Sequence, residues 1–253
     1  MTTNLVQLKK IRVGIVNYLN TRPLLYGLER NPIRDQLVIS LDYPAKVAAQ
    51  LKRGEIDLGL VPVALLKEAP HLQRVGTHCI ATNGEIASVC LFSQVPIEQV
   101  ETILLDYQSR TSAALARILI KHHFKKEVVF KETTADEYIG EIRGSQAGLI
   151  IGDRALQCRS EFPYRYDLGT EWKAFSGLPF VFAAWLASEE MPGDFLSNFD
   201  AANQEGLSCL PEVVAGIQSN ISYDLLHYFT KNVQYQWHPD MEKALQLFLH
   251  LAE

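Results

Sequence analysis

The chain has 253 residues, enough for one large domain or two modest ones at the usual size of roughly 150 residues per domain. Its composition, 47% hydrophobic and 21% charged, is that of an average globular protein and excludes a disordered, fibrous or coiled-coil chain. The formal charge of −5 provides no basic excess to neutralise phosphates, so nucleic acid is not expected as a partner.

No segment predicts a transmembrane helix. The most apolar window, residues 178–187, contains Pro179 and is far shorter than the roughly 18 residues that a bilayer-spanning helix needs. The first residues, MTTNLVQLKK, lack the charged region followed by an apolar stretch that marks an export signal. We therefore expect a cytoplasmic protein with no membrane partner.

Cysteine and histidine usage predicts neither a disulfide scaffold nor a metal site. The four cysteines are Cys79, Cys90, Cys158 and Cys209. They form no C-x-x-C pair, so we interpret them as buried free thiols without a redox role. The adjacent His122 and His123 would point about 100° apart on a helix, and no metal is expected.

The first part of the chain reads as strands that alternate with helices. Runs of β-branched residues predict strands, and leucines at helical spacing after a proline predict helices. The predicted strands are 11–16, 37–41 and 56–63, and the predicted helices begin at Thr21-Arg22-Pro23 and at Asp42-Tyr43-Pro44, the second closed by Gly54.

A second series of the same kind begins after the segment 87–93. Its predicted strands are 102–105, 128–130 and 148–151, and its predicted helices are 110–123 and one that opens at Thr133-Thr134. The chain then returns through 172–185 and ends in a helix at 241–252. Strands that alternate with helices imply βαβ crossovers, so the fold class is α/β with mainly parallel sheets.

One α/β unit interrupted by another predicts two lobes that face each other across a cleft. We place the discontinuous first lobe at residues 1–93 and 184–253 and the inserted second lobe at 94–183. The crossovers are expected near 91–96 and 182–185, with the ligand between the lobes.

The motifs G-x-G-x-x-G, G-x-x-x-x-G-K-[ST] and G-x-S-x-G are absent from the sequence, which argues against dinucleotide, nucleoside triphosphate and hydrolase sites.

Seven motifs follow one another between residues 11 and 253. They are YLN at 18–20 with Pro23, GxIDxGLVP at 54–62, SVxLFS at 88–93, SRTS at 109–112, GD at 152–153, DLGxEW at 167–172 and GLPFVFAxW at 177–185. In this order they resemble the chorismate dehydratase family of the futalosine route to menaquinone.

The resemblance implies a fold like that of type II periplasmic binding proteins, with two α/β lobes. It also implies a carbon-oxygen lyase, a hydro-lyase that converts chorismate to 3-[(1-carboxyvinyl)oxy]benzoate without a cofactor. The sequence leaves open whether the protein is a monomer or a homodimer. The substrate is a small dianion, and loss of water gives it an aromatic ring. The protein therefore mainly has to bind, orient and assist a poor leaving group.

Ser109, Arg110, Thr111 and Ser112 are the best candidates for binding a substrate carboxylate. They follow the predicted strand 102–105 and open the next helix, where hydroxyls and free N–H groups lie at the positive helix end. The same residues could instead form an ordinary N-cap with spare hydroxyls.

Asn20 and Ser88 are the candidate catalytic residues. Asn20 follows the first strand, at the edge where open α/β sheets bind ligands, and its amide could hold the departing oxygen. A turn or N-cap asparagine is the alternative. Ser88 lies in an otherwise apolar segment, so its hydroxyl must find a partner or face the cleft, and we favour the cleft.

Asp153 follows the predicted strand 148–151 and could bind substrate or only cap the next helix. Arg22 and Arg154 could each bind the second carboxylate of the substrate, and the sequence leaves both open. The motifs offer no histidine, lysine or cysteine as an evident base. We therefore hypothesise that a carboxylate of the bound substrate takes the ring proton itself.

Two other functions stay open. An enzyme of the same pathway and fold forms 1,4-dihydroxy-6-naphthoate from a cyclic nucleoside-derived substrate, although the YLN segment matches the dehydratase pattern. A non-catalytic small-anion binding protein would share the lobes and the anion site, but the missing export signal argues against it.

Overall fold

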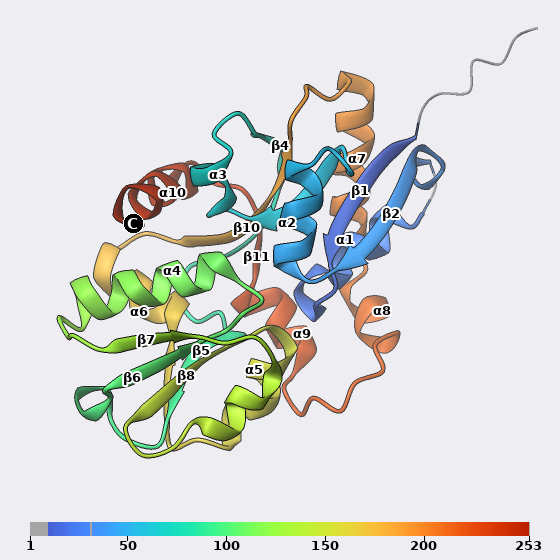
Figure 1. Cartoon of the computed structure of the whole chain (residues 1–253). Helices are drawn as coiled ribbons and strands as arrows, with labels where there is room; N and C mark the ends of the chain where they lie inside the picture. The colour runs from blue at the N-terminus through green and yellow to red at the C-terminus, as the bar shows by residue number, and fades with distance from the viewer. Residues whose placement is uncertain (1–9, 31, 253) are drawn as a thin grey trace, which may run out of the picture.

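Two β-sheets, each with its own helices, organise the residues that the computed structural model describes, 10–30 and 32–252 (Figure 1). The first sheet has the strand order β11 (Gln234–Gln236), β4 (Gln73–Thr82), β10 (Phe180–Ala187), β3 (Leu58–Pro62), β1 (Ile11–Val16), β2 (Leu37–Asp42). The second has the order β7 (Val129–Glu132), β6 (Thr102–Leu105), β8 (Gln146–Ile151), β5 (Val89–Ser93), β9 (Tyr164–Asp167).

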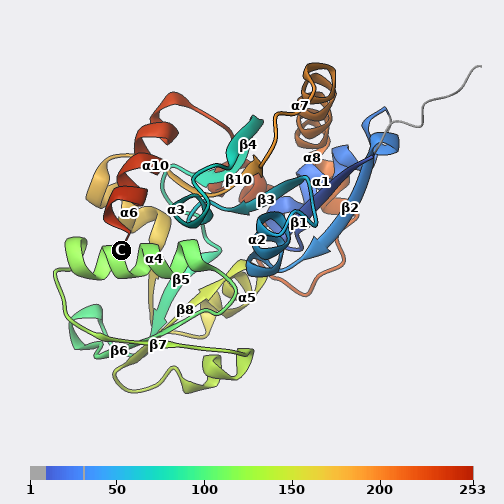
Figure 2. The ribbon, with the colours of Figure 1, turned by 45° about the horizontal axis from the view of Figure 1, so that its top comes forward.

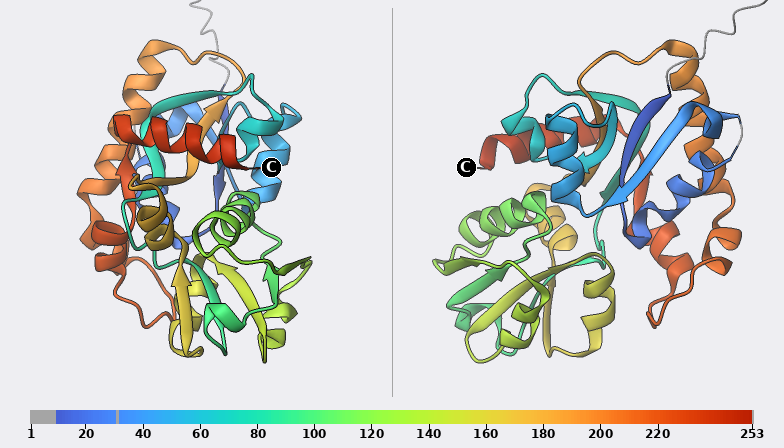
Figure 3. Two further views of the ribbon diagram at one scale, coloured as in Figure 1. Left: turned by 90° about the vertical axis from the view of Figure 1, so that its left-hand side faces the viewer. Right: turned by 45° about the vertical axis from the view of Figure 1, so that its right-hand side comes forward.

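The helices complete the two lobes. Those around the first sheet are α1 (Arg22–Leu28), α2 (Pro44–Lys52), α3 (Leu65–Glu68), α7 (Gly193–Ser208), α8 (Leu210–Ala215), α9 (Leu225–His227) and α10 (Pro239–Leu251). Those around the second are α4 (Arg110–Ile118), α5 (Gly152–Gln157) and α6 (Leu168–Ser176). Figures 2 and 3 show α4 on the side of the second sheet that is turned toward the first lobe.

Short 3₁₀ segments and two π-helical turns join these elements. The 3₁₀ segments are η1 (Leu19–Thr21), η2 (Ile33–Gln36), η3 (Ile97–Gln99), η5 (Asp136–Glu141) and η6 (Cys158–Ser160), and the π-helical turns are η4 (Leu119–His123) and η7 (Tyr228–Asn232). The helix predicted at 110–123 is therefore α-helical only to Ile118, and the one predicted from Thr133 is the 3₁₀ segment η5.

The α/β architecture is as predicted, but both sheets are mixed. β1 pairs in parallel with β2 and β3, and β6 with β7 and β8, as the alternation of strands and helices indicates. In contrast, β10 runs antiparallel to β3 and β4, and β5 antiparallel to β8 and β9. The expectation of mainly parallel pairing fails there because β5 and β10 enter from the other lobe and not through a βαβ crossover.

Strand pairing also differs from the predicted lobe boundaries at 93/94 and 183/184. All of β5 pairs within the second sheet, and β10 pairs with the first sheet from Phe180 onward. A fully buried apolar strand gives no sequence signal of which sheet it joins, so the ends of such a strand do not locate a lobe boundary. We propose instead that the chain passes between the lobes at residues 83–88 and 177–179.

The four cysteines are free thiols, and Cys209 is the one that is half-exposed. Within the described residues, no helix is both long and apolar enough to span a membrane.

Helices α1 and α7 pack with their backbones in contact. A Cβ atom on Gly27 would lie 1.7 Å from the carbonyl oxygen of Ala202, and one on Gly206 would lie 1.8 Å from that of Pro23. Only glycine fits at these two positions, because a backbone carbonyl cannot move aside as a side chain can. This contact fixes α1 and the loop that precedes it against the first lobe.

Gly206→Ala is therefore expected to lower the free energy of unfolding by about 1–3 kcal/mol, through overpacking at the α1–α7 contact. Urea unfolding followed by circular dichroism measures the change. Gly193→Ala in the same helix α7 is the control, because nothing lies within 4 Å of its added Cβ. Equal stability of the two variants would contradict the proposed backbone contact.

Candidate active site

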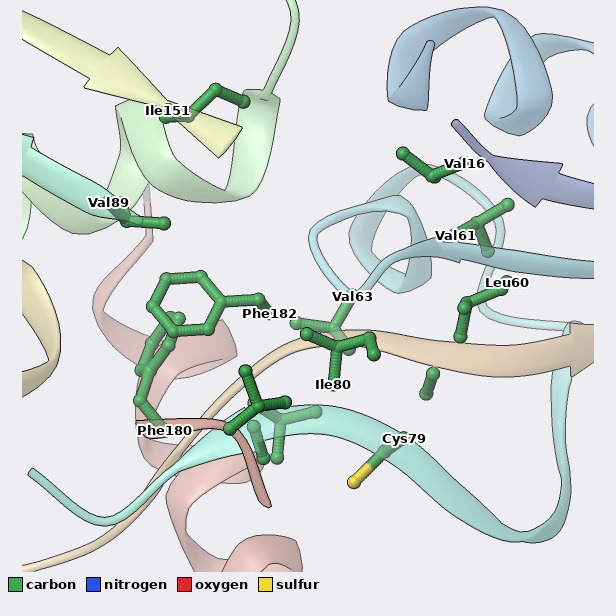
Figure 4. Packing of buried hydrophobic residues seen from close by; sticks show 14 of the residues in the cluster. Val16, Leu60, Val61, Val63, Cys79, Ile80, Val89, Ile151, Phe180 and Phe182 are labelled. Carbon is green, nitrogen blue, oxygen red and sulfur yellow. The ribbon is translucent and has the colours of Figure 1, made fainter. Parts of the chain in front are cut away.

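A cavity between the two lobes encloses about 530 Å³, including open solvent at its mouth. It is lined by Val16, Tyr18, Asn20, Thr21, Pro44, Leu60, Pro62, Ile80, Ile86, Ser88, Val89, Ser109, Ser112, Ile151, Gly152, Phe182 and Ala183. Figure 4 shows apolar members of this set reaching in from both sheets, Val89 and Ile151 from the second lobe and Val16 and Leu60 from the first. The walls are thus mostly apolar, with polar groups at a few points.

Four of the predicted site residues line this cavity: Asn20, Ser88, Ser109 and Ser112. None of the described residues that line it carries a charge. The first turn of α4 enters the lining through two of these serines, and Pro44 brings the first turn of α2 to it. A helix N-terminus carries a partial positive charge, so an uncharged lining of this kind still favours an anion.

Ser109 forms the N-cap of α4 as the sequence predicts. Its Oγ accepts a hydrogen bond from the Ser112 N–H at 3.2 Å and donates to Ser112 Oγ at 3.0 Å. The alternative of an N-cap and the candidate role in anion binding are therefore compatible, because the capping serines also face the cavity.

Arg110 and Thr111 do not line the cavity, contrary to the expectation that the whole 109–112 segment faces the ligand. The Arg110 side chain is 69% exposed and pairs with Glu68 on α3. Thr111 is buried, and its Oγ1 accepts a hydrogen bond from the Ala64 N–H of the first lobe at 3.1 Å. Successive residues of a helix point about 100° apart, which separates these two from the serines on either side.

Asp153 also lies outside the cavity lining. Its Oδ1 accepts a hydrogen bond from the Leu19 N–H at 2.9 Å, which links α5 of the second lobe to the loop after β1. Burial raises the pKa of its carboxyl group. Asp153 and Arg22 both line a second hollow, beside α1. Asp153 therefore connects the two lobes through its hydrogen bond to Leu19 and does not line the first cavity.

The two arginines left open by the sequence have protein partners. Arg22 donates to Asn17 Oδ1 at 3.1 Å. Nη2 of Arg154 donates to both carboxylate oxygens of the buried Asp106, at 2.8 and 3.0 Å, and Nη1 of Arg154 pairs with Asp136. Neither arginine lines the interlobe cavity.

Asn20 reaches the cavity from the loop after β1. This loop is held by the Thr21 hydroxyl, which donates to the carbonyl of Val16 at 2.6 Å and to that of Tyr18 at 2.8 Å. The Oδ1 atom of Asn20 is buried and has no hydrogen-bond partner among the described residues. An unpaired buried amide oxygen is unfavourable, so this group is ready for a polar ligand atom.

Ser88 lies directly after a strained turn at the crossover. Ala87 has a φ of 66°, in the left-handed region that residues other than glycine rarely adopt. The Asp167 carboxylate holds this turn, because it accepts hydrogen bonds from the Ile86 N–H at 3.0 Å and the Ala87 N–H at 2.7 Å. The Ser88 carbonyl accepts from the Gly152 N–H at 2.8 Å.

Two tyrosines near this site, Tyr18 and Tyr228, were not among the candidate site residues of the sequence analysis. Tyr228 donates to Ser88 Oγ at 2.7 Å from a π-helical turn, which has no recognisable sequence signal. Tyr18, within the YLN motif, donates to Gln108 across the lobes. Its ring covers Gly152, where an added Cβ would lie 3.1 Å from ring atoms.

Within the part of the chain that the structure describes, no group of three or more His, Cys, Asp or Glu side chains could hold a metal ion.

Comparisons with known proteins place the chain in a family. A family model described as menaquinone biosynthesis matches residues 11–253. The chorismate dehydratase of Thermus thermophilus is 26% identical in an alignment 258 positions long that covers 93% of each chain.

The fold is also found in solved structures. A crystal structure of a protein from Archaeoglobus fulgidus matches with a TM-score of 0.72 at 12% identity over 96% of each chain. A Candida albicans protein described as having the generic periplasmic binding protein fold matches with a TM-score of 0.63 at 13% identity, covering 97% of this chain and 90% of that one. The two-lobed, periplasmic binding protein-like fold is thereby confirmed.

Asp153→Asn is expected to change how the free energy of unfolding depends on pH. Because burial raises the pKa of Asp153 above its ordinary value of 3.8, the folded protein binds this proton more tightly than the unfolded chain. This tighter binding adds its whole contribution to the free energy of unfolding at pH values below the ordinary pKa. The contribution is lost as the pH rises through the raised pKa of the folded protein. The asparagine variant has no such loss, so its stability should improve relative to wild type as the pH rises.

Urea unfolding at acidic and neutral pH measures this difference. Asparagine still offers an oxygen to the Leu19 N–H, so the hydrogen bond itself is retained. Asp35→Asn, at an exposed position, makes the same charge change as a control. A stability difference between Asp153→Asn and wild type that does not vary with pH would contradict the prediction.

Proposed function

Because the chain belongs to the menaquinone biosynthesis family, we propose that it is a chorismate dehydratase, which removes water from chorismate to give 3-[(1-carboxyvinyl)oxy]benzoate. The observation that carries this proposal is the uncharged interlobe cavity, which brings Asn20 and Ser88 together with the N-terminus of α4. The Thermus thermophilus chorismate dehydratase supports it along nearly the whole chain.

Substrate binding requires a site for a dianion. One carboxylate would bind at the first turn of α4, where the hydroxyls of Ser109 and Ser112 line the cavity at the positive end of the helix. A favourable interaction of an anion with a helix N-terminus is worth about 0.3–1 kcal/mol at a surface and up to about 2 kcal/mol when partly buried. The apolar walls exclude water and so strengthen this interaction.

The reaction removes a hydrogen and a hydroxyl group from neighbouring ring carbons. The C–H electron pair becomes the new ring double bond, the C–O bond breaks, and the hydroxyl leaves as water with the proton that the C–H bond releases. Asn20 would hold the departing oxygen through its amide, and Ser88 would donate a hydrogen bond within the same cavity. Orientation is the main task, because aromaticity makes the elimination favourable.

The proton acceptor would be a carboxylate of the bound substrate. Among the described residues that line the cavity there is no histidine, lysine, aspartate or glutamate to act as a base. The nearby Asp153 is already an acceptor for the Leu19 N–H. A substrate carboxylate beside the ring hydrogen avoids the need for a protein base.

The same proposal covers the setting of the reaction. We expect a cytoplasmic hydro-lyase that acts without a cofactor on a small dianion, as a monomer or homodimer, with neither nucleic acid nor a membrane as partner. The menaquinone biosynthesis family supports the small-molecule substrate, and the net charge of −5 supports the exclusion of nucleic acid.

Incubation of the purified protein with chorismate tests the proposed function. The diene absorbance of chorismate should fall with time, and mass spectrometry should find a product lighter by one water. A binding protein of the same fold would retain chorismate unchanged. The 1,4-dihydroxy-6-naphthoate synthase alternative would also leave chorismate unchanged but convert the cyclic nucleoside-derived substrate.

Asn20→Asp is expected to lower turnover of chorismate more than Asn20→Ala does. Aspartate keeps the size of the side chain but replaces an amide donor with a negative charge beside a dianionic substrate. Steady-state kinetics of both variants show which of them has the lower turnover. Asn17→Asp, at an exposed position of the same loop, is the matched control for the added charge. If Asn20 serves only the turn, the aspartate variant will keep near wild-type turnover.

A further inference from the structure

We propose that Tyr228 is a positioning residue, which fixes the Ser88 hydroxyl by donating a hydrogen bond to its Oγ and so directs the Ser88 proton into the interlobe cavity. The distance between the two oxygens is 2.7 Å. Tyr228 itself does not line the cavity, whereas Ser88 does. This inference rests on the proposed dehydratase function and assigns a part in it to a residue behind the cavity wall.

The position of Tyr228 is itself fixed. Its side chain is 1% exposed, and its ring packs edge-on against Tyr223 with a centroid distance of 6.3 Å. Its backbone N–H donates to the Asp224 carbonyl at 2.9 Å at the start of the π-helical turn η7. Burial also raises the pKa of the phenol, so Tyr228 is a neutral hydrogen-bond donor.

The hydrogen bond determines what Ser88 can do. A serine hydroxyl has one proton and two lone pairs, and Tyr228 occupies one of the lone pairs. The Ser88 proton is then free for an acceptor on the cavity side, and an anionic substrate oxygen is a strong acceptor. A hydroxyl that accepts one hydrogen bond is also a better donor of the next.

The backbone of Ser88 is already held from both sides. The Asp167 carboxylate fixes the left-handed Ala87 before it, and the Gly152 N–H binds the carbonyl of Ser88. Such strain in a non-glycine residue persists only where the surroundings enforce it. Rotation of the Ser88 hydroxyl is the freedom that remains, and the bond from Tyr228 removes it.

Tyr228→Phe removes one oxygen and keeps the ring. We expect kcat for chorismate to fall about tenfold with little change in KM, because a hydrogen bond that orients a donor for the transition state is lost. Tyr223→Phe is the matched control, since it deletes the hydroxyl of the neighbouring tyrosine, which donates to Asn232 Oδ1 at 2.9 Å. This control should keep wild-type kcat.

A double-mutant cycle with Ser88→Ala tests whether Tyr228 acts through Ser88. If it does, Tyr228→Phe lowers kcat about tenfold when Ser88 is present and less than about twofold in the Ser88→Ala background. Equal effects in both backgrounds would overturn the inference, because Tyr228 would then act by packing or through Asn20, whose side chain also hydrogen-bonds the Tyr228 phenol, and not through Ser88. A wild-type protein that does not dehydrate chorismate would instead refute the proposed function.

A second variant covers the case in which phenylalanine disturbs the fold. Incorporation of 3-fluorotyrosine at position 228 keeps the ring and hydroxyl but makes the phenol a stronger donor. The kcat should then rise in the protein that contains Ser88 and stay the same in Ser88→Ala. A rise in both, or in neither, would overturn the assignment of Tyr228.

Discussion

The Asp167 carboxylate is the point on which the crossover between the lobes depends. It accepts N–H groups from Ile86 and Ala87 in the crossover, and it also caps α6 through the Thr170 N–H at 3.0 Å. One buried side chain thus connects a strained turn, a helix of the second lobe and the segment that leads to Ser88. Without this acceptor, nothing would offset the backbone strain of the left-handed Ala87 or the cost of leaving the buried N–H groups of Ile86 and Ala87 without hydrogen bonds.

The uncharged lining of the cavity bears on the chemistry as well as on binding. An arginine beside the substrate carboxylate would bind it more tightly but would also lower its pKa and weaken it as a base. Helix ends and hydroxyls such as Ser109 and Ser112 can hold an anion with less effect of this kind, because their charges are partial. A site of this type suits a substrate that supplies its own proton acceptor.

The sequence predicted most elements with strong periodicity, including the strands 11–16 and 102–105, which the structure confirms. It also named the cavity-lining Asn20, which follows the first strand within the YLN motif, and Ser88, which lies in an otherwise apolar segment. It could not predict the bond from Tyr228 to Ser88, which joins residues 140 positions apart. Nor could it separate Arg110 from Ser109, because which face of the helix is turned to the cavity depends on how the two lobes pack.

Helix α4 touches both the ligand cavity and the opposite lobe. Ser109 and Ser112 face the cavity, while Thr111 binds the Ala64 N–H and Arg110 pairs with Glu68. A rigid helix cannot move one of these faces without the other, so occupancy of the cavity and the spacing of the lobes are thermodynamically linked. A ligand that contacts Ser109 or Ser112 is therefore coupled, through this one helix, to the contacts that Thr111 and Arg110 make with the first lobe.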